Sequence, residues 1–140
     1  MNAGRRAFAS ALGAAALLLA APVFAGSYLT RAALLIAEGR REGDLLRVHF
    51  ADKELANTVH RMALARVDVA GTMLVPREVV QAHPHLLLIF ESYERAADAA
   101  LNSQAERFIA LLQRALDEER TFRAVLKQFG WELPSSHDDR

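Results

Sequence analysis

The chain has 140 residues, no cysteine, and 17 basic against 17 acidic side chains. A chain without cysteine cannot form disulfide bonds, perform thiol catalysis, attach haem through paired cysteines or bind a metal through thiolates. The balanced charge also leaves no basic face of the kind that nucleic acid binding requires.

The N-terminus has the three parts of a secretory signal peptide. Arg5 and Arg6 are basic, and the stretch Ala7–Ala25 that follows contains no charged residue. Small residues precede Gly26 at the positions that a signal peptidase reads. We therefore predict a signal peptide over residues 1–25, cleaved before Gly26, and a periplasmic or secreted mature protein.

Two alternatives remain open for this segment. The arginine pair, with Phe8 two residues beyond Arg6, resembles a twin-arginine signal, a route that exports folded proteins. The uncharged stretch of 19 residues is also marginally long enough to span a bilayer as an uncleaved anchor. Its alanine and glycine content makes it weakly hydrophobic, which favours cleavage. The mature chain, residues 26–140, then has 115 residues, a net charge of −2 and no stable membrane anchor.

The mature chain begins with a helix predicted over residues 28–50. Ser27 is available as its N-cap, and apolar residues from Tyr28 onward fall on one face. Gly39 and Gly43 weaken the middle of this helix and could mark a break between two shorter ones. We predict one continuous helix, in which glycines four residues apart allow a neighbouring helix to approach closely.

A second helix is predicted over residues 52–74. Asp52 is a favourable N-cap, and the apolar residues that follow are spaced by four and three. Arg66 occupies one position where this apolar face should continue. The helix should end before Pro76, because the residue preceding a proline is disfavoured in the helical conformation.

A third helix is predicted to end at residue 101 and to begin at residue 76 or residue 84. Pro76 could open a short first turn, and Pro84 then either kinks the helix or starts a new one. Asn102 is expected to leave this helix in the left-handed conformation.

A fourth helix is predicted over residues 103–129. Ser103 and Glu106 have the spacing of a capping box, in which the two side chains satisfy free backbone N–H groups. Apolar residues then step by three and four, with Glu119 as the exception. Gly130 is expected to end the helix as a C-cap.

Four helices joined by short turns predict an all-α, antiparallel four-helix bundle over residues 26–131. Residues 132–140 are predicted to be a disordered polar tail. Arg66 and Glu119 are expected to meet across the core as a buried ion pair that fixes the helix register. Alternatively, both charges reach solvent at the edge of the apolar face.

His83 and His85, on either side of Pro84, are the best candidates for a metal site. Imidazole is a common metal ligand, and an H-x-H pair can place two rings on one side of a turn. The alternative is that both histidines are exposed to solvent or cap the helix.

No catalytic motif is present in the sequence. It contains no glycine-rich phosphate loop, no G-x-S-x-G motif and no Ser/His/Asp set. The Glu-x-x-His motif of di-iron bundles is also absent. A haem held by His60 and Met62 or Met73 has no further support, so no cofactor is expected.

These observations favour a non-catalytic protein that acts by protein–protein interaction in the bacterial envelope. Its partner is expected to be another envelope protein or a second copy of the chain. Candidate surfaces are the face of Gly39 and Gly43 and the connection Val75–His85. The alternative function is periplasmic metal binding or metal sensing by His83 and His85.

Overall fold

The computed structural model describes the backbone of residues 3–135 and the side chains of residues 24–135. Its elements are α1 (Ala3–Val48), α2 (Lys53–Thr72), the short 3₁₀ helix η1 (Arg77–Val79), α3 (His83–Leu101) and α4 (Ala105–Gln128). No strand occurs over residues 3–135, so the all-α prediction is confirmed. The predicted signal peptide lies mostly on residues whose side chains are outside the described part of the chain. Residues 136–140 of the predicted tail also lie outside the described residues.

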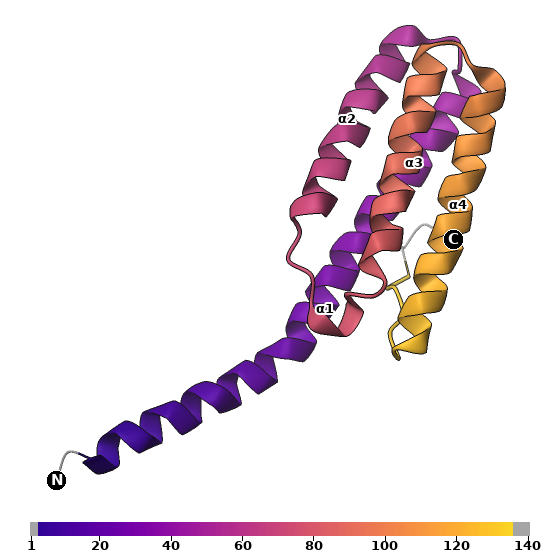
Figure 1. Cartoon of the computed structure of the whole chain (residues 1–140). Coiled ribbons are helices and arrows are strands. Elements are labelled where there is room, and N and C mark those ends of the chain that lie inside the picture. Colours follow the sequence, from indigo (N-terminus) through magenta and orange to yellow (C-terminus); the bar gives the residue numbers. More distant parts are fainter. Residues whose placement is uncertain (1–2, 136–140) are drawn as a thin grey trace.

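The helix α3 lies between α2 and α4, and α1 crosses behind it (Figure 1). The contacts of α3 with α2 and α4 are more extensive than those of α1 with any other helix. Polar contacts also join α2 to α3: Lys53 Nζ donates to the carbonyl of Ala100 at 2.7 Å, and His60 Nε2 lies 2.9 Å from Glu94 Oε1.

The core forms around α3, because this helix is enclosed by the other three. Its apolar residues recur around most of its circumference, as is expected of a helix that is covered on several sides. Leu133 also packs against the core, so the packed part of the chain continues beyond the predicted boundary at residue 131. The largest fully buried side chains include Leu46, Leu86, Ile89, Phe90, Phe108, Phe122 and Leu126.

The helix α1 is continuous through Gly39 and Gly43, as predicted. The predicted bounds at residues 28 and 50 are wrong: α1 runs from Ala3 to Val48, so Ser27 lies inside the helix and is not its N-cap. Both glycines face Tyr93 of α3: a Cβ atom at Gly39 would lie 2.9 Å from Tyr93 Cδ2, and one at Gly43 would lie 3.3 Å from Tyr93 Cε1. The glycines therefore let the aromatic ring lie directly against the backbone of α1. This face is buried, so it is not available to a partner.

The boundaries of α2 and α3 follow the predicted signals. The side chain of Asp52 accepts a hydrogen bond from the backbone N–H of Leu55 at 3.0 Å, which caps α2. Four residues after the end of α2, Pro76 leads into η1. Pro84 lies in the first turn of α3, where it needs no N–H partner, so a new helix begins there and no kink forms.

The predicted capping box at the start of α4 is wrong. Ser103 has a positive φ of 58°, whereas an N-cap residue has extended dihedrals. Gln104 holds the N-cap position without a side-chain hydrogen bond to the backbone, so Ser103 and Glu106 do not cap each other. The prediction for Asn102 is wrong as well, because its φ is −94° and the left-handed residue is the next one.

Ser103 instead closes α3 in a Schellman motif. Its N–H donates to the carbonyl of Ala100 at 3.1 Å, and the N–H of Gln104 donates to the carbonyl of Ala99 at 2.9 Å. The end of α4 has the same motif around Gly130, which has a φ of 81°. Gly130 is therefore a C-cap, as predicted, and one backbone geometry is formed once by glycine and once by serine.

Because a side chain in the left-handed conformation costs about 1–2 kcal/mol, we expect Ser103→Gly to stabilise the protein by about 0.5–1 kcal/mol. The reciprocal change, Gly130→Ser, should destabilise the protein by about 1 kcal/mol, because it places a side chain on a left-handed residue. No contact is lost at either site, so both effects come from the backbone conformation. Urea unfolding of both variants measures the two effects. Equal changes of the same sign would contradict this explanation.

Candidate interaction surface

His83 contacts α1 and α2 from the first turn of α3. Its Nδ1 atom lies 2.8 Å from the hydroxyl of Tyr28, and the two rings are tilted by 56° with centroids 5.8 Å apart. The imidazole also forms a hydrogen bond with the backbone of Ala70 in α2. His83 thus links three helices through both polar contacts of one side chain.

His85 faces a different neighbour. Its Nδ1 atom lies 3.3 Å from Glu118 Oε2 of α4, so its contacts are separate from those of His83. Over residues 24–135, no group of three or more metal-ligating side chains is placed to hold an ion. The metal site at His83 and His85 therefore stays a prediction that this arrangement does not support.

Burial lowers the pKa of His83 below its ordinary value of 6.5. The unfolded chain then binds a proton at a higher pH than the folded one, so this contribution to stability is complete above about pH 6.5. It is lost as the pH falls through the lower pKa of the folded state. We expect the free energy of unfolding to decrease between pH 7.5 and pH 5, and to decrease less in His83→Gln, which cannot titrate.

Urea unfolding of the wild type and His83→Gln at both pH values measures this difference. The other histidines contribute equally to the pH dependence of both proteins, so their contributions cancel in the comparison. The same pH dependence in both proteins would show that His83 does not carry the effect.

The residues considered for a haem do not converge. His60 pairs with Glu94 of α3, and Met62 on the same helix is 49% exposed. Met73 is partly buried at the other end of α2, beside Tyr28 and Leu74. No two of these groups face each other as axial ligands do.

Arg66 is buried, as its position on the apolar face implied, but its partner lies on α1. Its Nη2 atom donates to both carboxylate oxygens of Glu42 at 2.8 Å, and Glu38 Oε2 is 3.9 Å away. Among the described residues, Nε and Nη1 of Arg66 have no hydrogen-bond partner. The charge of Arg66 is therefore balanced almost entirely by Glu42.

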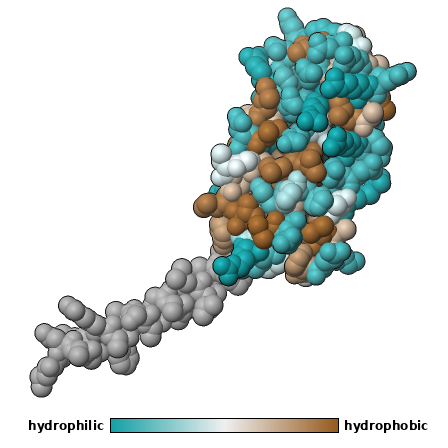
Figure 2. All heavy atoms as spheres, in the orientation of Figure 1, coloured by the Kyte–Doolittle hydropathy of each residue, from teal (hydrophilic) through white to brown (hydrophobic). Residues whose placement is uncertain are grey.

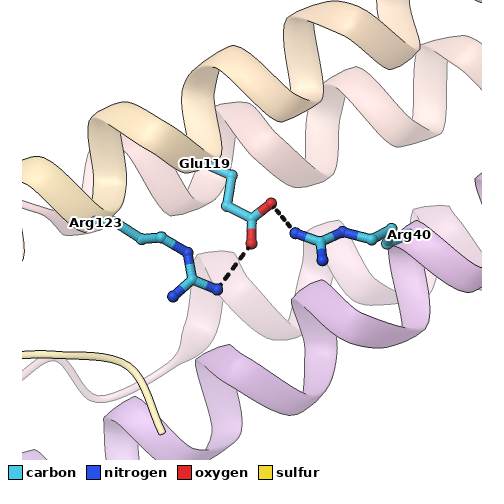
Figure 3. A network of polar contacts seen from close by, with 3 residues as sticks. All are labelled: Arg40, Glu119 and Arg123. Carbon is cyan, nitrogen blue, oxygen red and sulfur yellow. Dashed lines mark hydrogen bonds and ion pairs between the residues drawn. The ribbon is translucent and has the colours of Figure 1, made fainter. Parts of the chain in front are cut away.

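Glu119 is also buried, and two arginines hold it (Figure 3). Arg40 of α1 contacts one carboxylate oxygen, and Arg123, one turn along α4, contacts the other at 3.1 Å. Both arginines are about half exposed. Burial raises the pKa of Tyr93 to about 12, and the nearby Glu119 carboxylate adds to this increase.

The predicted pair between Arg66 and Glu119 is therefore wrong. The helices α2 and α4 lie on opposite flanks of α3, so α1 supplies the partner of each buried charge, Glu42 for Arg66 and Arg40 for Glu119. The sequence holds a signal for this arrangement. The charged residues Arg40 and Glu42 stand beside the glycines that let α1 approach α3.

The contact between α1 and α2 forms a seam with apolar side chains on both sides. On α1, Leu34 lies one turn before Glu38 and Leu45 lies one turn after Glu42, so both share the face of this ion pair. On α2, Met62 and Val69 flank Arg66 in the same way. All four side chains are more than 40% exposed, and we call these four residues the α1–α2 seam.

The seam opens into a groove of about 400 Å³. One wall of the groove is formed by residues 24–31 of α1, and the other wall is formed by the end of α2 and the two residues that follow it. The lining residues are Phe24, Ser27, Tyr28, Arg31, Val69, Thr72, Met73 and Leu74. Arg31 is the only charged side chain among these lining residues.

Comparison with known proteins provides no identification. No family model, curated protein or solved structure matches this chain. Considering only residues that the structure describes, none of the helices is both long enough and apolar enough to cross a membrane.

Proposed function

We propose that this chain is an exported, non-catalytic protein that binds a partner protein in the bacterial envelope. In this proposal, residues 1–25 act as a signal peptide, and the mature chain is an antiparallel bundle in the periplasm or outside the cell. The partner is an envelope protein or a second copy of the chain.

The α1–α2 seam is the observation that carries the proposal. The two helices contact each other less than either contacts α3, and Leu34, Leu45, Met62 and Val69 remain exposed along their junction. An amphipathic helix binds such a groove by placing its apolar face between two helices. The ion pair of Arg66 and Glu42 lies in the middle of this seam, with both carboxylate oxygens already accepting from Arg66.

A matched pair of substitutions tests this surface. Met62 in the seam and Ile109 on α4 are 49% and 51% exposed, so a charge at either position should perturb folding equally little. We expect Met62→Asp to abolish capture of an envelope partner by the mature protein, and Ile109→Asp to leave capture unchanged. If the partner is a second copy of the chain, sedimentation should show that Met62→Asp loses self-association and that Ile109→Asp keeps it.

Equal capture by the two variants, at concentrations where both are folded, would contradict a role of the seam. His83 and His85 contact different helices, an arrangement that gives a metal-binding function no support.

A further inference from the structure

One end of the bundle brings together the point where α1 leaves it, the connection between α2 and α3, and the C-terminal end of α4 (Figure 1). Each of these three parts has a large exposed apolar side chain: Phe24 on α1, Leu74 and Val80 in the connection, and Phe129 after α4. We call these four residues the exit end. Apolar surface gathers near the departing helix (Figure 2).

The chain that leaves the exit end is apolar in sequence. Ala7–Ala25 contains no charged residue, and it belongs to the same uninterrupted helix as the part of α1 that packs in the bundle. No linker separates the two parts, because α1 continues to Val48. A membrane that receives the uncharged stretch is therefore held against the exit end, since Phe24 is part of that stretch.

We propose that the exit end is a bilayer-binding face, on which Phe24, Leu74, Val80 and Phe129 enter the interfacial region of a membrane. This inference concerns the chain that still carries residues 1–25, before cleavage or as an uncleaved anchor, because Phe24 and the uncharged stretch are part of that segment. It rests on the export part of the proposed function, because it requires the N-terminal segment to enter a bilayer. It goes beyond that function by orienting the bundle, with the α1–α2 seam running away from the membrane.

The charges at this end determine the expected lipid dependence. Arg77 and Glu78, both exposed, lie between Leu74 and Val80 in the chain and carry opposite charges. Long basic side chains such as Arg77 can keep the charge at the headgroups while their stems lie in apolar surroundings. With opposite charges side by side, apolar contact should dominate, and binding should depend little on anionic lipid.

A protein partner is a weaker candidate for this end. It would have to cover side chains from three separate elements while leaving room for the uncharged helix that leaves the bundle beside the other two (Figure 1). A bilayer meets both requirements at once, because the helix enters it and the surrounding side chains rest on its surface.

The absence of cysteine allows a direct test with the full chain. Single substitutions Leu74→Cys and Val80→Cys carry a fluorescent label at the exit end, and Val48→Cys and Ile109→Cys carry it elsewhere. Val48 is the matched control for Leu74, since the two side chains are 76% and 78% exposed. The labelled proteins are reconstituted into phosphatidylcholine vesicles containing a lipid-attached quencher, with and without phosphatidylglycerol.

We expect quenching at positions 74 and 80 in both vesicle types, and no quenching at positions 48 and 109. Leu17→Cys, within the uncharged stretch, reports whether that stretch enters the bilayer. An unquenched label at position 17 removes the premise and overturns the inference. Quenching at position 17 without quenching at positions 74 and 80 overturns it too.

The outcome is separable from that of the proposed function. Loss of partner capture in Met62→Asp, together with unquenched labels at the exit end, would reject the bilayer-binding face and keep the partner-binding seam. Quenching at the exit end with unchanged capture in Met62→Asp would reject the seam and keep the bilayer-binding face.

Discussion

Replacing Glu42 by alanine should lower the free energy of unfolding by about 3 kcal/mol, which is the lower end of the cost of breaking a buried ion pair. The side chain of Arg66 is only 4% exposed, and Glu42 receives both hydrogen bonds that its guanidinium makes. Removing the carboxylate leaves a buried charge without a partner. The loss is held near the lower end because Glu38, 3.9 Å away, can take over part of the contact.

The matched control is Glu38→Ala. It removes a carboxylate from the same helix and near the same arginine, but Glu38 is mostly exposed, so the expected loss is below about 0.5 kcal/mol. The double variant Glu42→Leu/Arg66→Met replaces the pair by apolar groups and should be as stable as the wild type or more so. Urea unfolding measures all three. Equal losses in Glu42→Ala and Glu38→Ala would show that Glu42 does not balance Arg66.

The starts of α2 and α3 could be predicted because local chemistry determines them. Asp52 caps α2 through a contact within one turn, and Pro84 starts α3 because its missing N–H needs no partner in the first turn. The burial of Arg66 and Glu119 could also be predicted, since each interrupts an apolar face at a core position.

The partners of the buried charges could not be predicted in the same way. A periodic pattern tells which face of a helix is buried, but it does not tell which helix covers that face. Arg66 and Glu119 have complementary charges, yet α3 separates their helices, and each is paired from α1. The pairing depends on how closely α1 approaches, and that distance is set by two glycines and one aromatic ring.

The misplaced cap at Ser103 has a related cause. The residues of a capping box describe the start of a helix, but the same residues also end the preceding helix when the turn is short. Here the backbone closes α3 in a Schellman motif, and this fixes Ser103 in a conformation that an N-cap cannot adopt. Two local preferences competed for one residue, and the closure of α3 determined its backbone.

The close approach of α1 to α3 predicts the second large effect: Gly39→Val should lower the free energy of unfolding by about 3 kcal/mol. A Cβ atom at this position would lie 2.9 Å from Tyr93 Cδ2 and 3.2 Å from Cε2. The ring cannot turn away freely, because its other edge lies against Gly43. Overpacking of a close-packed core costs about 1–3 kcal/mol, and a β-branched side chain adds bulk at the point of contact.

Gly71→Val is the matched control, because a Cβ atom at Gly71 in α2 would meet nothing within 4 Å. We expect its effect to stay within about 0.5 kcal/mol, as is usual for an exposed substitution. The change Tyr93→Val should recover part of the loss when it is combined with Gly39→Val, because the smaller side chain leaves room for the new one. A double-mutant cycle in urea unfolding should therefore give a coupling of about 1–2 kcal/mol between positions 39 and 93. Additive effects at these two positions would mean that the glycine face does not set the distance between α1 and α3, and that some other contact holds Arg40 and Glu42 in reach of the buried charges.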